Sequence, residues 1–198
     1  MAPLILASTS QVRAKLLRQA CVPFDVIPAR MDEDTIKASM VADEARARDI
    51  ADALAEAKAR KVASKHPGAL IIGADQVLEF QGELLSKPAT QDDALTQLRS
   101  MRGAKHKLFS AAVIYEDMKP VWRHVGVVTL TMRNFSDDWL EGYVNRNWDS
   151  IQHAVGAYKL EEEGARLFTR IDGDYFHVLG LPLLEILSYL TLRGTLPS

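Results

Sequence analysis

A carboxylate stands inside the hydrophobic segment Ile71–Val77, where Asp75 follows two small residues. An ionised carboxylate is costly to bury unless a cation or hydrogen-bond donors compensate it. Three reasons would account for its place: a bound metal ion, a role as a catalytic base, or a structural hydrogen bond to a neighbouring loop. Glu33, in the acidic cluster at 32–34, is a candidate second carboxylate, although such a cluster also fits a solvated loop.

Hydroxyl side chains gather where the apolar segment Leu4–Ala7 gives way to a helical pattern, at Ser8 and Ser10. Hydroxyls and free backbone amides at a helix N-terminus form an anion site, and Arg13, one turn later, adds a full positive charge. An ordinary serine cap followed by a solvated arginine is the alternative interpretation.

Two lysines have defined surroundings. Lys58 lies four residues after Leu54 and four before Val62, which places it on the apolar face of a helix. A lysine there either snorkels at the edge of the core or faces a bound anion. Lys87 precedes Pro88, which restricts its backbone to an extended conformation and gives its side chain a defined direction, although a surface loop lysine fits as well.

Strands and helices that must position these side chains alternate along the chain. Strand patterns are predicted at Leu4–Ala7, Phe24–Pro28, Ala69–Gly73, Gln76–Phe80, Lys107–Tyr115, Trp122–Arg133 and near Arg166–Ile171. Helices are predicted from a Ser10 cap to Ala20, over Ala42–Lys65, from Thr90 to Met101, from Ser136 to about Val144, and from Pro182 onward. Asp75 falls in a gap between two strand segments. This order predicts an α/β fold with a mixed sheet.

Composition and net charge limit the classes of protein to which this chain can belong. The 198 residues include 24 Lys+Arg against 26 Asp+Glu, a net charge of −2, and 47% are hydrophobic. A packed core is therefore expected, and no global field would hold nucleic acid or an anionic membrane. No segment approaches the ~18 uninterrupted apolar residues of a membrane helix, so we expect a soluble cytoplasmic protein. The single cysteine, Cys21, is expected to fill core space.

Taken in order, these pieces resemble the Maf family of nucleoside triphosphate pyrophosphatases. The resemblance spans about residues 4 to 190. The motifs that carry it are Leu6-Ala7-Ser8-Thr9-Ser10-x-x-Arg13, Asp32-Glu33, Leu54-Ala55-x-x-Lys58-Ala59, Gly73-Ala74-Asp75-Gln76-Val77, Lys87-Pro88, Gly103-x-x-His106, Gly156-Ala157-Tyr158 and Val178-x-Gly180-Leu181-Pro182-Leu183.

The resemblance implies a fold, a reaction and a set of roles. It implies a single Maf-like domain over 1–198, with two lobes sharing one core around a central mixed sheet and a nucleotide cleft between them. It also implies hydrolysis of a nucleoside triphosphate to the monophosphate and pyrophosphate with Mg²⁺ or Mn²⁺, by a homodimer. The residues implied to hold the triphosphate are Ser8, Ser10, Arg13, Lys58 and Lys87. Glu33 and Asp75 are implied to serve the metal and the attacking water, with Asp75 as the base.

The base preference is a separate expectation. Within the resemblance, Gln76 and Glu161 match a group that acts on 7-methyl-GTP, and a carboxylate such as Glu161 suits the N–H donors of guanine. Val12 matches neither that group nor the dTTP- and UTP-hydrolysing group, and Gln11 replaces a usual proline. We expect 7-methyl-GTP or another modified nucleotide as substrate.

Three alternatives remain open at this stage. The first is a dTTP/UTP pyrophosphatase. The second is a catalytically weak nucleotide-binding regulator linked to cell division, which the departures at Gln11 and Val12 motivate. The third is an unrelated serine hydrolase that would place one of the five histidines beside a nucleophile.

Overall fold

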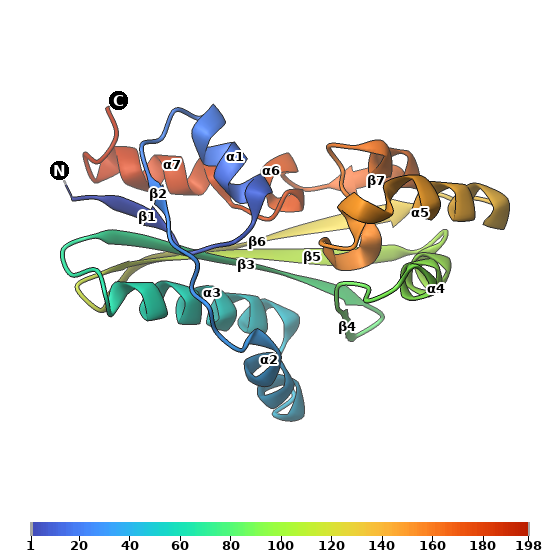
Figure 1. Cartoon of the computed structure of the whole chain (residues 1–198), viewed down its shortest axis with the longest axis horizontal. Coiled ribbons are helices and arrows are strands. Elements are labelled where there is room, and N and C mark those ends of the chain that lie inside the picture. Colours follow the sequence, from blue (N-terminus) through green and yellow to red (C-terminus); the bar gives the residue numbers. More distant parts are fainter. Residues whose placement is uncertain (1, 198) are drawn as a thin grey trace. The chain divides into compact units, whose positions relative to one another are not determined.

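The computed structural model describes residues 2–197 (Figure 1). Seven strands form one mixed sheet in the order β2-β1-β3-β5-β6-β7, and β4 pairs with β3 off this path. The chain divides into two compact units. The first comprises the chain up to Gln76, Ser110–Gly126 and the chain from Gly180; the second comprises Val77–Phe109 and Val127–Leu179. The expected α/β class with a central mixed sheet is confirmed.

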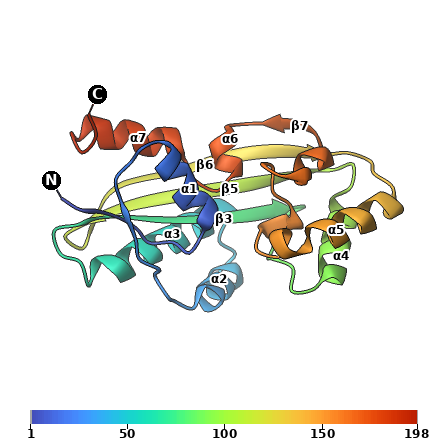
Figure 2. The same cartoon turned by 45° about the horizontal axis from the view of Figure 1, so that its top comes forward.

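Parallel pairing organises the first unit. Strand β1 (Leu4–Leu6) lies between β2 (Asp25–Val26) and β3 (Leu70–Phe80), and both pairs are parallel. Helices α1 (Gln11–Gln19) and α7 (Leu183–Leu192) lie on one side of the sheet. Helix α3 (Ala47–Ala63) lies on the other side, as Figures 1 and 2 show. The core between these layers contains the buried side chains Leu6, Leu17, Ile50, Ile71 and Ile72.

The long helix predicted over Ala42–Lys65 is present but begins later, since α3 runs from Ala47 to Ala63. A separate helix, α2 (Glu33–Ala42), precedes it, and Glu44, which has a left-handed backbone at φ 56°, lies between the two. The Ala45 N–H donates to the Met40 carbonyl at 2.9 Å, which closes the end of α2. Alanine-rich composition favours helix throughout this stretch and does not reveal the break.

The predicted interruption of the strand at Ala74 and Asp75 is wrong. Strand β3 runs without interruption from Leu70 to Phe80 and carries Asp75 within it. A single charged side chain does not end a strand when its backbone keeps its ladder partners and its charge finds a counter-ion.

The second unit contains an antiparallel part of the sheet and its own core. Its elements, some of which share residues with the first unit, are β4 (Glu83–Leu85), α4 (Gln91–Met101), β5 (Lys105–Glu116), β6 (Lys119–Met132), α5 (Asp137–Ile151), β7 (Phe168–Asp172) and α6 (Tyr175–Val178). Short 3₁₀ turns span Val155–Ala157 and Glu163–Leu167. Helices α4 and α5 contact each other and bury Leu98 and Tyr143 in this core. Helix α5 extends past the predicted end at Val144.

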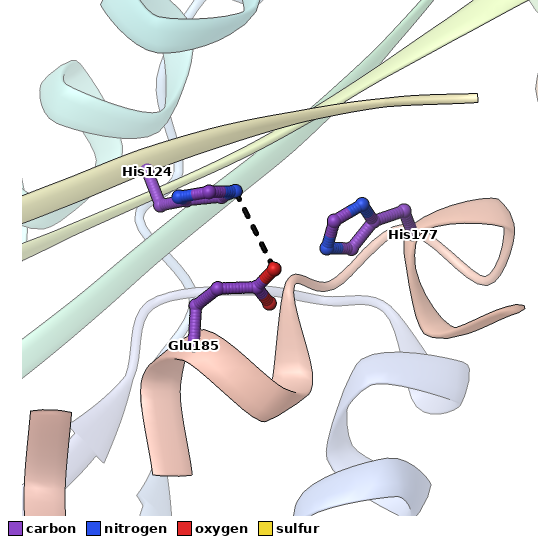
Figure 3. Close-up of side chains that lie close together, drawn as sticks. All are labelled: His124, His177 and Glu185. Carbon is purple, nitrogen blue, oxygen red and sulfur yellow. Dashed lines mark ion pairs between the residues drawn. The ribbon is translucent and has the colours of Figure 1, made fainter. Parts of the chain in front are cut away.

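One polar pair and one aromatic pair join β6 to α7 in the first unit. His124 Nε2 lies 3.5 Å from a carboxylate oxygen of Glu185 (Figure 3), and the Trp122 ring stacks on Tyr189 at 5.5 Å. His177, also drawn in Figure 3, belongs to α6 of the second unit, where its backbone N–H donates to the Asp174 carboxylate at 3.3 Å.

Cys21 is exposed, so the expectation that it fills the core is wrong.

Candidate active site

An ion-pair cluster, buried at Lys58 and Asp75 and exposed at Glu33, joins the two predicted carboxylates. Lys58 Nζ donates to Asp75 Oδ1 at 2.6 Å and lies 2.8 Å from Glu33 Oε2. The side chains of Lys58 and Asp75 are only 9% and 10% exposed, whereas that of Glu33 is 48% exposed. The structure thus brings together three residues that lie on α2, α3 and β3, and Lys58 does not simply snorkel at the edge of the core.

A close approach of helix to strand makes this cluster possible. A Cβ on Gly73 would lie 2.1 Å from the carbonyl oxygen of Ala55 and 2.6 Å from the backbone nitrogen of Ala59. Any side chain at Gly73 would therefore push α3 away from β3. Since Ala55 and Ala59 flank Lys58 on the same helix, the glycine sets the distance from which the ammonium reaches Asp75.

Arg13 is buried and hydrogen-bonded to three segments of the first unit. Its Nε donates to the Gly180 carbonyl at 2.7 Å, and its Nη1 donates to the Ala74 carbonyl at 3.0 Å and to Ser8 Oγ at 3.3 Å. Burial lowers the pKa of the guanidinium, and the nearby charges of Asp75 and Glu33 oppose that shift. Arg13 therefore links three segments of the chain. They are the residues around Ser8 before α1, the part of β3 at Ala74, and the turn at Gly180.

The two predicted serines are placed at the start of α1. Ser10 is the N-cap and its hydroxyl accepts from the Arg13 backbone N–H at 3.4 Å, while the Ser10 N–H donates to Ser8 Oγ at 3.2 Å. The predicted cap is confirmed. Ser8 is buried and also accepts from Arg13, so its hydroxyl belongs to the polar cluster and is not simply a solvated cap.

Gln76, half-buried next to Asp75, donates from Nε2 to Ser110 Oγ at 3.0 Å, and Ser110 is completely buried. This contact orients the amide on the strand that carries the carboxylate. Lys87 and Glu161 belong to the second unit, where Lys87 is exposed after β4 and Glu161 is exposed in a turn. Their predicted roles in substrate binding stay predictions.

Two features that position the site residues were not predicted from the sequence. Helix α2, capped by the Asp32 carboxylate that accepts from the Thr35 N–H at 3.0 Å, was not among the predicted helices. The capping pattern was the signal that could have found it. The Gly180 carbonyl, an acceptor for Arg13, has no side-chain signature at all.

The donor set at the cluster fits a hard divalent cation. Glu33 Oε2 lies 2.8 Å and Asp75 Oδ1 lies 2.6 Å from the same Lys58 ammonium. The two carboxylate oxygens are therefore close to each other. Carboxylate oxygens without nitrogen or sulfur partners suit Mg²⁺ or Mn²⁺ better than zinc. These two residues would hold such an ion.

The first unit thus brings two carboxylates and the buried cations Lys58 and Arg13 close to β3, an arrangement that can bind anions and their counter-ions. Comparison with known proteins identifies the family. A family model described as Maf-like protein matches residues 3–192, so the chain belongs to the Maf-like family.

Similar proteins cover nearly the whole chain. A nucleoside triphosphate pyrophosphatase of Roseobacter denitrificans is 65% identical over 98% of both chains. A protein of the same name from Ruegeria pomeroyi is 62% identical over 99% of this chain and 98% of its own length. One from Caulobacter vibrioides is 46% identical over the same shares. In the described part of the chain, every helix is too short or too polar to cross a membrane.

Proposed function

We propose that this protein is a nucleoside triphosphate pyrophosphatase, a hydrolase that converts a nucleoside triphosphate and water into the monophosphate and pyrophosphate. The observation that carries the proposal is the buried Lys58–Asp75 pair with Glu33 beside it. Relatives that share 62–65% identity over almost their entire length carry that name. The chain retains the motifs through which it resembles the family.

The reaction places specific demands on these side chains. Water attacks the α-phosphorus, the bond between this atom and the bridging oxygen breaks, and pyrophosphate leaves with the electron pair. Asp75 orients the water and accepts its proton, a role that typically contributes ~10²–10⁴-fold in rate. Lys58 neutralises charge that develops on the transferred group. Mg²⁺ or Mn²⁺, when bound by Glu33 and Asp75, would offset charge on the phosphates and the leaving group.

Substrate choice rests on Gln76 and Glu161. The Gln76 amide is oriented by Ser110, and a carboxylate at Glu161 would accept from the N1–H and N2–H₂ groups of a guanine. Since both residues match the group of the family that acts on 7-methyl-GTP, we expect 7-methyl-GTP or another modified nucleotide to be preferred over dTTP and UTP. We further propose a cytoplasmic homodimer, whose mass in solution light scattering would measure.

A product analysis tests the proposal. Purified protein with Mg²⁺ or Mn²⁺ is incubated with 7-methyl-GTP, GTP, dTTP and UTP, and nucleotides and pyrophosphate are separated and quantified. We expect equal amounts of monophosphate and pyrophosphate, with the highest kcat/KM for 7-methyl-GTP. In ¹⁸O-labelled water the label should enter the monophosphate. Release of inorganic phosphate with a nucleoside diphosphate would contradict the proposal, and tight binding without turnover would favour a nucleotide-binding regulator.

A further inference from the structure

Two motifs that the proposed reaction does not use meet in the second unit. His106, of Gly103-x-x-His106, lies on β5, and Tyr158, of Gly156-Ala157-Tyr158, follows a short 3₁₀ turn. His106 Nε2 lies 2.7 Å from the Tyr158 hydroxyl, and both side chains are buried. Burial lowers the pKa of the imidazole and raises the pKa of the hydroxyl, so both groups are neutral at pH 7. One neutral hydrogen bond thus joins the two motifs.

Packing alone does not require this polar pair. His106 Nδ1 is buried and has no hydrogen-bond partner among the described residues. A buried polar atom without a partner is costly, and two hydrophobic side chains would fill the same space without that cost. The Phe168 ring already packs against both rings, with its centroid 4.8 Å from that of Tyr158 and 6.0 Å from that of His106. What the hydrogen bond adds is a fixed position for the end of the Tyr158 side chain.

The backbone just before Tyr158 has a conformation that the surrounding protein must impose. Gly156 and Ala157 both have a left-handed backbone, at φ 77° and 57°, and Ala157 is completely buried. This conformation costs free energy in a residue other than glycine and persists only where its surroundings hold it. The Tyr143 hydroxyl, on α5, donates to the Ala157 carbonyl at 3.2 Å. Hydrogen bonds at Ala157 and at Tyr158 therefore hold this turn at two consecutive residues.

The chain that follows this turn leads directly to Glu161. The Glu162 N–H donates to the Lys159 carbonyl at 3.3 Å, and a Cβ on Gly164 would lie 2.4 Å from the same oxygen, so this stretch is closed on itself. Ser150 Oγ, on α5, accepts from Lys159 Nζ at 2.6 Å and donates to Glu162 Oε2 at 2.7 Å. Glu161 is exposed, and its side chain makes no hydrogen bond or ion pair with any of residues 2–197. Its neighbours are fixed, whereas its own carboxylate is available to a ligand.

We propose that His106 and Tyr158 are positioning residues for base selection: their hydrogen bond holds the turn at 156–158, from which the chain presents Glu161 to the base of the nucleotide. The inference rests on the proposed function, because it concerns how the same substrate is recognised. It gives a role to two motifs that take no part in the ion-pair cluster of the first unit. The left-handed backbone at Ala157 then belongs to a pre-organised binding turn.

A double-mutant cycle on the full chain tests this inference. Wild type, Tyr158→Phe, Glu161→Ala and the double variant are compared by the ratio of kcat/KM for 7-methyl-GTP to kcat/KM for UTP. Tyr158→Phe removes one hydroxyl and keeps the ring, and we expect it to lower the ratio by about 3- to 10-fold, the effect of one hydrogen bond. Glu161→Ala should lower the ratio at least as much. In the Glu161→Ala background, Tyr158→Phe should lower it no further, because the residue that Tyr158 positions is already removed.

Tyr115→Phe is the matched control. The Tyr115 hydroxyl donates to Glu56 Oε1 at 2.7 Å within the first unit, so this variant removes a tyrosine hydrogen bond of the same length and leaves the Glu161 turn intact. We expect it to keep the wild-type ratio. His106→Gln, which keeps a polar group beside the Tyr158 hydroxyl, should retain most of the ratio, whereas His106→Leu should lower it as Tyr158→Phe does.

The outcomes separate this inference from the proposed function. A merely structural role predicts that Tyr158→Phe lowers the thermal unfolding temperature and leaves the ratio unchanged, or changes it equally with and without Glu161; either result overturns this inference alone. If wild type hydrolyses triphosphates and Glu161→Ala keeps the ratio, base selection by this turn is wrong and hydrolysis stands. If wild type hydrolyses no triphosphate, the proposed function is wrong, and this inference with it. If Tyr158→Phe does not fold, Tyr143→Phe, which removes the other hydroxyl bond to the turn, replaces it with the same expected result.

Discussion

Lys58 Nζ and Asp75 Oδ1 lie 2.6 Å apart, with both side chains about one-tenth exposed. The ammonium of α3 is the counter-ion that lets β3 carry a carboxylate in a hydrophobic strand. The same ammonium contacts Glu33, so the pair is the centre of a three-residue cluster. Removing either partner would leave a charge in a site from which water is largely excluded.

The first prediction concerns this ion pair. Lys58→Met should lower the free energy of unfolding by about 3–5 kcal/mol, because Asp75 loses its buried counter-ion. Urea denaturation measures the change. Lys61→Met, on the exposed side of the same helix, is the matched control and should stay within about 0.5 kcal/mol of wild type.

A double variant makes this test sharper. Lys58→Met combined with Asp75→Asn should recover part of the lost stability, because no unpaired carboxylate remains. Equal losses in Lys58→Met and Lys61→Met, or strictly additive losses in the double variant, would show that the pair contributes nothing specific.

A second prediction follows from the contact between α3 and β3. Gly73→Ala should lower the free energy of unfolding by about 3 kcal/mol or more, because its Cβ would meet rigid backbone atoms of Ala55 and Ala59. Activity should fall as well, since the shift of α3 moves Lys58 away from Asp75.

The matched control is the same substitution inside α5. A Cβ at Gly142 would meet only the movable end of the Arg146 side chain. Gly142→Ala should therefore raise stability by about 0.5–1 kcal/mol, the difference in helix propensity between the two residues. A destabilisation of similar size in both variants, measured by chemical denaturation, would show that the approach at Gly73 is not unusually close.

The third prediction concerns the pH dependence of stability. His106 is buried, and its Nε2 lies 2.7 Å from the Tyr158 hydroxyl. Burial lowers the pKa of its imidazole to about 4 from the ordinary 6.5. Between these values the unfolded chain binds a proton that the folded chain does not, so stability is fully present above pH 6.5 and falls as the pH drops toward 4. The loss would reach about 3 kcal/mol.

Denaturant titrations of wild type and His106→Gln at pH values from 4 to 7 measure this loss. The variant lacks the titrating imidazole, so the difference between the two slopes isolates its contribution from that of the carboxylates. If both proteins show the same slope, His106 does not stay neutral in the folded chain.

Residue spacing and composition predicted several features of the candidate site, but not those that depend on tertiary contacts. The Ser10 cap and the position of Lys58 on an apolar face follow from spacing alone, and both are confirmed. The break at Glu44 requires a left-handed backbone that an alanine-rich segment does not announce. The uninterrupted strand through Asp75 depends on an ammonium 17 positions away in the chain.

Arg13 is a second example of a residue whose tertiary contacts cannot be predicted from spacing. Its spacing from Ser10 predicted a cation one turn into a helix, and Arg13 does lie in the first turn of α1, while the anion site itself stays a prediction. Its hydrogen bonds to the carbonyls of Ala74 and Gly180 join segments 61 and 167 positions away. Carbonyl acceptors carry no side-chain pattern, so the sequence does not reveal that this arginine holds the site together.

The central claim is that the Asp75 carboxylate drives hydrolysis at the α-phosphorus. The most direct measurement is the rate of pyrophosphate release by wild type and by Asp75→Asn with the best substrate and Mg²⁺, with folding checked by thermal unfolding. We predict that the folded variant loses activity by about 10²–10⁴-fold or more. A folded Asp75→Asn protein that releases pyrophosphate at the wild-type rate would contradict the account.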